Sequence, residues 1–168
     1  MIREATAADL PFIRELHLAS WRDAYRGMLP DAYLDGPVEA DMHARWDRLP
    51  EPAIVLVAPE GFVCCLLGRP IPYVDNLHAA PSARRSGTGR ALMARLASAL
   101  LARAERAMYL TVIDANARAR GFYRAMGGVE GAPLEEIEGG APILVRGVTW
   151  DEDALRALAS LDAPQRPA

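Results

Sequence analysis

The sequence has few cysteines, no long apolar run and no excess of basic residues, and each shortage excludes a class of protein. Its 168 residues contain two cysteines, and these are adjacent, Cys64 and Cys65, within an apolar run. Neighbouring residues of a strand point to opposite faces, so we expect reduced, buried thiols and no disulfide between them. A scaffold held together by disulfides is therefore not expected.

Membrane and export signals are also missing. No stretch approaches the roughly 18 apolar residues that predict a membrane-spanning helix. The opening, MIREATAADL, lacks a positively charged start followed by an apolar run, so we expect no signal peptide. Together with the reduced thiols, these absences predict a cytoplasmic protein without a membrane partner.

The charge balance is nearly even and slightly acidic. Nineteen basic and 22 acidic side chains give a formal net charge of -3, which argues against bulk binding of nucleic acid. Any phosphate site must then be local. The length, with 51% hydrophobic residues, predicts one domain over residues 1–162 followed by a frayed tail, residues 163–168.

Hydrophobic periodicity and turn residues predict the order of the elements. Strands are expected at residues 1–5, 53–60, 61–69, 72–81, 107–114, 129–137 and 143–150. Helices are expected at residues 6–25, 31–47, 88–106, 116–128 and 151–161. This order predicts an α/β (mixed α+β) fold, with one central mixed sheet of six to seven strands and helices on both faces.

The segment APSARRSGTGRAL, residues 80–92, concentrates arginines, glycines and hydroxyl residues between an expected strand and an expected helix. It lacks the Lys-Ser/Thr end of a P-loop, and a dinucleotide fingerprint would need glycine where Leu92 stands. What remains is the pattern Arg84-x-x-Gly87-x-Gly89.

This pattern suits a diphosphate. Backbone N–H groups without intrahelical partners and the helix dipole favour an anion at a helix N-terminus. Glycines let phosphate oxygens approach closely, while guanidinium and hydroxyl groups add hydrogen bonds. The residues concerned are Arg84, Arg85, Ser86, Gly87, Thr88, Gly89 and Arg90. From this segment alone, a capped turn with solvated arginines is an equally good interpretation.

A second pattern changes the balance. Asn116, Ala119, Phe122, Tyr123 and Gly127 form Asn-x-x-Ala-x-x-Phe-Tyr-x-x-x-Gly on the helix after the fifth strand. Together the two patterns resemble those of the GNAT superfamily of N-acetyltransferases, which use acetyl-coenzyme A (acetyl-CoA). The resemblance covers roughly residues 2–150, and the opening residues look like those of one bacterial group within the family.

The resemblance implies a GNAT-like sheet splayed between the fourth and fifth strands, and it implies where the coenzyme binds. The segment 84–90 would bind the pyrophosphate. The backbone of Leu77, His78 and Ala79 would pair with the pantetheine arm like an extra strand. Asn116 would contact the coenzyme near its thiol, a role compatible with capping its helix. No metal is implied.

The resemblance also suggests catalytic roles. Tyr123 is the expected general acid, which would protonate the leaving thiolate; without the family, packing of an aromatic on the core is the simpler interpretation. The base is unassigned, with His78 or a water relayed by it as the candidate. Asp75 and His78 should alternate along their strand and so not share a face. Trp21 and Tyr25 either line the acceptor pocket or pack on the sheet.

The sequence departs from the family pattern in two ways. Gly128 stands where a large apolar residue often follows the motif glycine, and no glutamate on the fourth strand supplies a base. The expected function is transfer of an acetyl group from acetyl-CoA to a primary amine of a small molecule or peptide. The alternatives are a catalytically silent acyl-CoA-binding or sensor module and a plain α/β domain. Exposed strand edges favour a homodimer.

Overall fold

A computed structural model describes residues 1–83 and 85–162; Arg84 and the predicted tail, residues 163–168, lie outside the described residues. The strands are β1 (Arg3–Glu4), β2 (Ala53–Ala58), β3 (Gly61–Leu66), β4 (Tyr73–Ala79), β5 (Met108–Ile113), β6 (Val129–Glu138) and β7 (Ala141–Trp150). The α-helices are α1 (Leu10–Ala24), α2 (Asp31–Leu34), α3 (Val38–Arg45), α4 (Thr88–Ala102), α5 (Ala117–Ala125) and α6 (Glu152–Ala159). Short 3-10 turns occur at Ala7–Asp9, Pro81–Ala83 and Ser160–Asp162.

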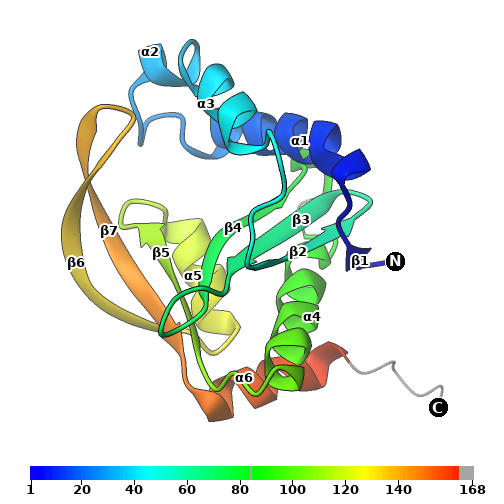
Figure 1. Ribbon diagram of the computed structural model, residues 1–168. Coiled ribbons are helices and arrows are strands. Elements are labelled where there is room, and N and C mark those ends of the chain that lie inside the picture. Colours follow the sequence, from blue (N-terminus) through cyan, green and yellow to red (C-terminus); the bar gives the residue numbers. More distant parts are fainter. Residues whose placement is uncertain (84, 163–168) are drawn as a thin grey trace.

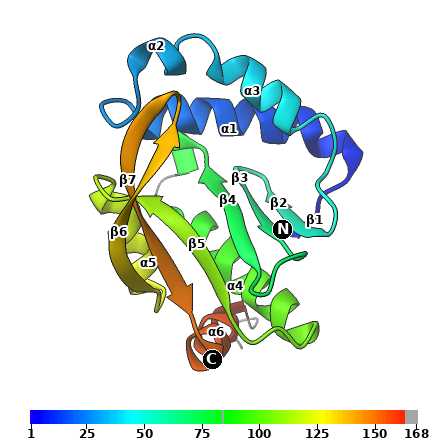
Figure 2. The ribbon, with the colours of Figure 1, turned by 60° about the vertical axis from the view of Figure 1, so that its left-hand side comes forward.

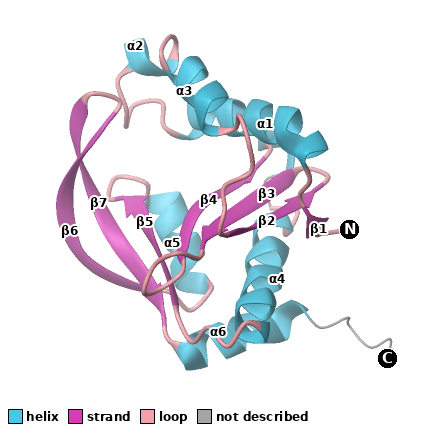
Figure 3. Ribbon diagram, viewed as in Figure 1, coloured by secondary structure: helices cyan, strands magenta, loops and turns pink. Residues whose placement is uncertain are grey.

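The seven strands form one mixed sheet in the order β1-β2-β3-β4-β5-β7-β6. Neighbouring strands are antiparallel except β4 and β5, which are parallel. Helices α1 and α3 lie over one face, and α4 and α6 lie over the other (Figures 1 and 3). The predicted mixed sheet with helices on both faces is confirmed.

Strands β4 and β5 separate soon after they meet. Among the described residues, Tyr73 and Tyr109 are the one pair that joins them in register, whereas β5 pairs with β7 along its whole length. The edge of β4 beyond Tyr73 therefore faces β5 without a continuous ladder, and Figure 2 shows the two strands side by side. The predicted splay between the fourth and fifth strands is confirmed, and it leaves backbone donors and acceptors of β4 available to a ligand.

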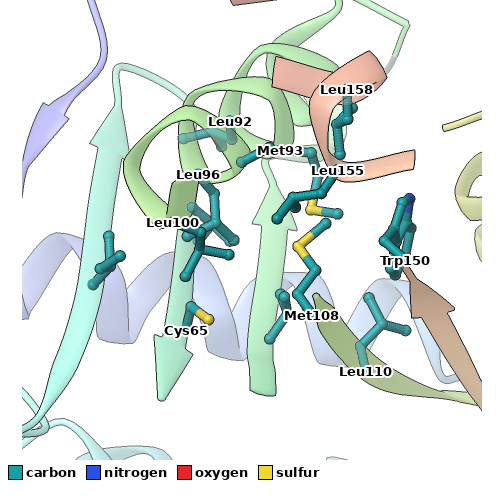
Figure 4. Close-up of a cluster of buried hydrophobic side chains, with 14 of the residues drawn as sticks. Cys65, Leu92, Met93, Leu96, Leu100, Met108, Leu110, Trp150, Leu155 and Leu158 are labelled. Atoms are coloured by element: carbon teal, nitrogen blue, oxygen red, sulfur yellow. The ribbon is translucent and has the colours of Figure 1, made fainter. Parts of the chain in front are cut away.

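Each face of the sheet has its own core. On the α4 and α6 side, Leu96, Leu100, Leu155 and Trp150 pack together and are almost fully buried (Figure 4). The adjacent cysteines confirm the predicted alternation, because Cys65 belongs to this core and Cys64 to the core under α1. Both thiols are free, and burial raises the pKa of each to about 12. Neither cysteine can supply a thiolate at neutral pH.

Two helices differ from the sequence prediction. The expected helix at residues 31–47 is divided into α2 and α3, because Gly36 and Pro37 interrupt it. The expected helix at residues 88–106 ends at Ala102. Ala104 there adopts a φ of 60°, and the amide of Glu105 donates to the carbonyl of Leu100, so the chain leaves the helix one turn early.

Gly128, the departure from the family pattern, is explained by packing. A Cβ at this buried position would lie 2.5 Å from Val148 and 2.7 Å from Trp150, closer than real contacts allow. The indole N–H of Trp150 also donates to the carbonyl of Met126, which holds the Trp150 ring beside the turn between α5 and β6. The glycine therefore lets the start of β6 pack tightly against β7. Across the described residues, no helix is both long and apolar enough to cross a bilayer.

Candidate active site

An extra residue in β4 changes which of its side chains share a face. Cys64 is paired with Asn76 and Cys65 with Val74, so Asp75 is inserted between two paired residues as a β-bulge. Asp75 forms an ion pair with Arg45 of α3, and it also accepts from the Asn76 amide, 2.7 Å away. The prediction that Asp75 and His78 alternate is therefore wrong, because the bulge turns both toward the α1 and α3 side.

A polar cavity of about 190 Å³ lies next to the gap between β4 and β5. Its lining residues come from five regions of the chain that are distant in sequence. They are Trp21, Tyr25, Leu29, Arg45, Tyr73, Asp75, Asn76, Thr111, Val112, Ile113, Asn116, Ala119, Tyr123, Glu136, Glu138, Ile143 and Val145. The structure thus brings together five of the residues selected from sequence: Trp21, Tyr25, Asp75, Asn116 and Tyr123.

Tyr123 reaches the cavity from α5, the short helix beside the gap. Its ring contacts Phe122 and Trp150 edge to face, with centroids 5.3 and 6.0 Å apart, so it packs on the core as the simpler interpretation expected, and it also lines the cavity. Its role as general acid stays a prediction. No hydrogen bond among the described residues occupies its hydroxyl group. Burial, together with the nearby Tyr25 and Tyr73, raises the pKa of Tyr123, so the phenol keeps its proton at neutral pH.

Asn116 has the capping role that its sequence position suggested. Its side-chain oxygen accepts from the amide of Ala119 at 3.1 Å and so holds the first turn of α5. The residue is 7% exposed and lines the cavity. Because the cap fixes the start of α5, it also fixes the position of Tyr123 two turns later.

His78 is not brought to the cavity. Its ring is buried against His17, with ring centroids 4.4 Å apart, and its Nδ1 lies 2.9 Å from the Ser20 hydroxyl of α1. Burial, with a smaller effect from Arg45, lowers the pKa of His78 to about 3. The side chain proposed from sequence as the base therefore has no support in this geometry, because it lies among α1 side chains and does not line the cavity.

His17 is locked in its neutral form. The indole of Trp46 donates to its Nδ1 at 2.8 Å, and an indole N–H cannot accept, so this nitrogen carries no proton. Burial and the neighbouring His78 lower the pKa of His17 strongly. Two of the three histidines thus enter the folded state uncharged, whereas His43 is exposed on α3.

We therefore expect stability to fall as the pH drops below about 6.5, the ordinary histidine pKa. Below that pH the unfolded chain binds protons at His17 and His78, while the folded chain excludes them, so unfolding becomes favoured. Each histidine contributes up to about 1.4 kcal/mol per pH unit once the pH is well below 6.5, so the free energy of unfolding should drop by roughly 3 kcal/mol between pH 6.5 and 5. Thermal and urea unfolding from pH 8 to 5 measure this slope. His43→Gln is the control and should leave the slope unchanged; a flat profile would contradict the assignment.

The segment before α4 is a tight turn with a free helix start. Arg85 has a φ of 65° and Gly87 a φ of 87°, both left-handed, which only glycine adopts without strain. The Ser86 hydroxyl donates to the Ala83 carbonyl at 2.7 Å and lies 2.8 Å from the Thr88 hydroxyl. These two hydroxyls therefore build the turn itself. Arg84, placed in the phosphate site from sequence, lies outside the described residues.

Backbone amides at the start of α4 remain available. The amide of Thr88 donates to Ser86 Oγ and that of Ala91 to the Gly87 carbonyl. The intervening amides of Gly89 and Arg90 have no acceptor among the described residues. Gly89 also lets α4 approach α5 closely, because a Cβ at this position would lie 3.3 Å from the Phe122 ring of α5. The two sequence patterns thus touch in space, since each lies on one of these helices.

Sequence reasoning missed the residues that line the cavity from α3 and the β6–β7 hairpin. The charged ones are Arg45, Glu136 and Glu138, and the apolar ones are Ile143 and Val145. Gly139 and Gly140 form the turn of the hairpin with positive φ, and a Cβ at Gly139 would lie 2.7 Å from the Tyr33 ring of α2. The alternation Glu136-x-Glu138 places both carboxylates on one face of β6, but the sequence carries no signal that this face turns toward β4.

Comparison with known proteins gives the same family as the motifs. The family model described as "Acetyltransferase (GNAT) family" matches residues 14–127. The uncharacterized N-acetyltransferase YuaI of Bacillus subtilis is 27% identical over 125 residues, which cover 68% of this chain and 72% of YuaI. A crystal structure of the ribosomal-protein-alanine N-acetyltransferase of Brucella melitensis shares the fold with a TM-score of 0.66 and 22% identity, covering 90% of this chain and 99% of that one.

A third structure, of yncA from Salmonella typhimurium with its cofactor acetyl-CoA, superposes with a TM-score of 0.65 at 19% identity. The superposition covers 91% of this chain and 94% of yncA. Structural likeness at this identity establishes the fold, whereas the family model covers more than half of the chain in sequence. With both sequence patterns, the splayed sheet and the family match in agreement, this chain belongs to the GNAT family of acetyltransferases.

Proposed function

We propose that the protein transfers an acetyl group from acetyl-CoA to a primary amine of a small molecule or peptide. The observation that carries this proposal is the opening between β4 and β5, which has the cavity of Tyr123 beside it and the free start of α4 after the end of β4. An extended thioester fits such an opening because one end needs an anion site and the other a place where the amine meets it.

The residues present fit the coenzyme. The amides of Gly89 and Arg90, with the Arg85 and Arg90 guanidinium groups, would hold the diphosphate at the helix start. The edge of β4 at Leu77, His78 and Ala79 lies beyond the pair that joins β4 to β5 and would bind the pantetheine amides. Asn116, which is buried and lines the cavity, would approach its thiol end. The coenzyme supplies the thioester, whose acetyl group passes to nitrogen.

The cavity residues would serve the acceptor and the leaving group. Trp21 and Tyr25 lie at one side, with rings 5.1 Å apart, and Asp75 lies at the bulge. Tyr123 holds a proton that no described residue shares, and it can donate that proton to the departing sulfur. This arrangement supports an enzyme over a silent acyl-CoA-binding module, because a proton donor beside the acceptor cavity is needed for acetyl transfer and not for binding alone.

Two measurements test the proposal. Acetyl-CoA should raise the melting temperature, since a ligand that binds only the folded state stabilises it, whereas an acetate control should not. Release of free thiol should then follow addition of primary amines. The chain contains no lysine, so its own side chains contribute no amine background to this assay. Stabilisation without thiol release across a broad amine panel would favour the binding module; the absence of both would overturn the proposal.

A further inference from the structure

We propose that the acceptor is a short dication with an amine at each end, one end reacting beside Tyr123 and the other held by Glu136 and Glu138 of the β6–β7 hairpin. This inference rests on the proposed function and names the substrate class of the same cavity. It follows from three independent features of the lining: its charges, its aromatic rings and the fixed position of the hairpin.

The charges of the lining are unbalanced. Three carboxylates and one guanidinium group line the cavity, and Arg45, the single cation among them, is already paired with Asp75. Glu136 and Glu138 have no ion-pair partner among the described residues. Glu138 is half-buried, and loss of solvent raises its pKa, although the amide of Gly139 donates to it and the charge of Arg45 partly opposes the rise. A cationic group would supply the missing charge at this end.

Aromatic rings accompany these carboxylates. Trp21 and Tyr25 meet at 5.1 Å in an edge-to-face arrangement on the same cavity, and ring faces attract ammonium groups. Tyr25 and Glu138 line the same cavity. Burial raises the pKa of Tyr25 to about 12, and the negative charge of Glu138 adds to the rise. Ring faces and carboxylates together recognise an organic cation, whereas an acceptor carboxylate at this end would meet Glu136 and Glu138 and be repelled.

The hairpin is held in place. The Gly139 backbone lies so close to the Tyr33 ring of α2 that a Cβ there would overlap it, and Tyr33 is tied in turn to Asp41 of α3 by a 2.6 Å hydrogen bond. Figure 1 shows the tip of the hairpin beside α2. Glu138, one residue before this contact, is therefore positioned before any ligand arrives. A cavity of about 190 Å³ suits a short chain.

The chemistry at the reacting end balances without the second amine. One nitrogen loses a proton to solvent, its lone pair forms a bond to the acetyl carbon, and the same nitrogen then loses a second proton to solvent as the amide forms. The carbon–sulfur bond breaks with its electron pair going to sulfur, which takes the Tyr123 proton, and the phenol is restored from solvent. The product is an N-acetylated monocation, which keeps the charge that Glu136 and Glu138 hold.

The test compares 1,4-diaminobutane with butylamine, which has the same carbon chain and one amine. Thiol release by the wild-type protein should give a kcat/KM about thirtyfold higher for the diamine, because charge-assisted contacts to carboxylates are strong. Glu138→Gln should reduce this preference to within about fivefold, mainly through the KM of the diamine. Glu135→Gln is the matched control, since Glu135 is exposed on the same strand and does not line the cavity; it should keep the full preference.

The outcomes separate the two proposals. Equal use of both amines by the wild-type protein, or a preference that survives Glu136→Gln with Glu138→Gln, overturns the dication while leaving acetyl transfer intact. A preference for the free amino acid glycine, which carries a carboxylate in place of the second amine, over the diamine also overturns the dication and leaves acetyl transfer intact. If acetyl-CoA gives no thermal stabilisation and neither amine releases thiol, the proposed function fails, and the dication fails with it.

Discussion

Replacing Tyr123 by phenylalanine is expected to lower kcat about a hundredfold or more, within the range that general acids contribute. The exchange removes one oxygen and leaves the ring, whose contacts with Phe122 and Trp150 hold α5 against the sheet. Because burial raises the pKa of this phenol, the wild-type group is protonated throughout the neutral range and able to donate. Steady-state thiol release at saturating amine measures the loss.

Binding and folding should be preserved in the same variant. Isothermal calorimetry with acetyl-CoA should give a Kd within about threefold of wild type, since the hydroxyl lies in the cavity and not at the start of α4. Tyr109→Phe is the matched control: Tyr109 lies where β4 and β5 are still paired, and its hydroxyl accepts from Arg69 at 3.3 Å on the surface. Full turnover in Tyr123→Phe would remove the phenol from the mechanism.

Most helices and strands could be predicted from the sequence because the spacing of apolar residues within each segment determines its secondary structure. The apolar stripe of Leu92, Leu96 and Leu100 placed α4, and the cysteines pointed to opposite cores as their alternation required. The errors lie where one or two residues interrupt a periodic pattern. Ala104 ended α4 early, and Asp75 entered β4 as an extra residue that no local pattern marks.

The candidate site divides in the same way. Asn116 and Tyr123 follow from a motif on one helix, so sequence spacing could place them together. The place of Glu138 in the cavity could not be predicted from sequence spacing. It depends on how far the hairpin curves and on the contact between Gly139 and Tyr33, which are about a hundred residues apart in sequence. The surroundings of His78 could not be predicted for a similar reason: its ring partners, His17 and Phe62, come from α1 and β3.

The start of α4 gives the second large effect. Arg90→Glu is expected to weaken acetyl-CoA binding about thirty- to a hundredfold, because it replaces a charge-assisted contact with repulsion of the diphosphate. The same change should leave folding stability equal or slightly higher, since a negative side chain in the first turn of a helix interacts favourably with the dipole. Weaker acetyl-CoA binding without any loss of stability would show that Arg90→Glu affects the binding site and not the fold.

Arg103→Glu is the charge-matched control. Arg103 follows the last residue of the same helix, roughly 22 Å from its start for a helix of 15 residues, beyond the screening length at physiological salt. It changes the net charge equally and should leave the Kd for acetyl-CoA unchanged while slightly lowering stability, because a negative group is unfavourable at the helix C-terminus. Calorimetry gives the Kd for acetyl-CoA of each variant, and thermal unfolding gives the stability of each. Equal Kd values for the two would place the diphosphate away from α4, and with it the coenzyme.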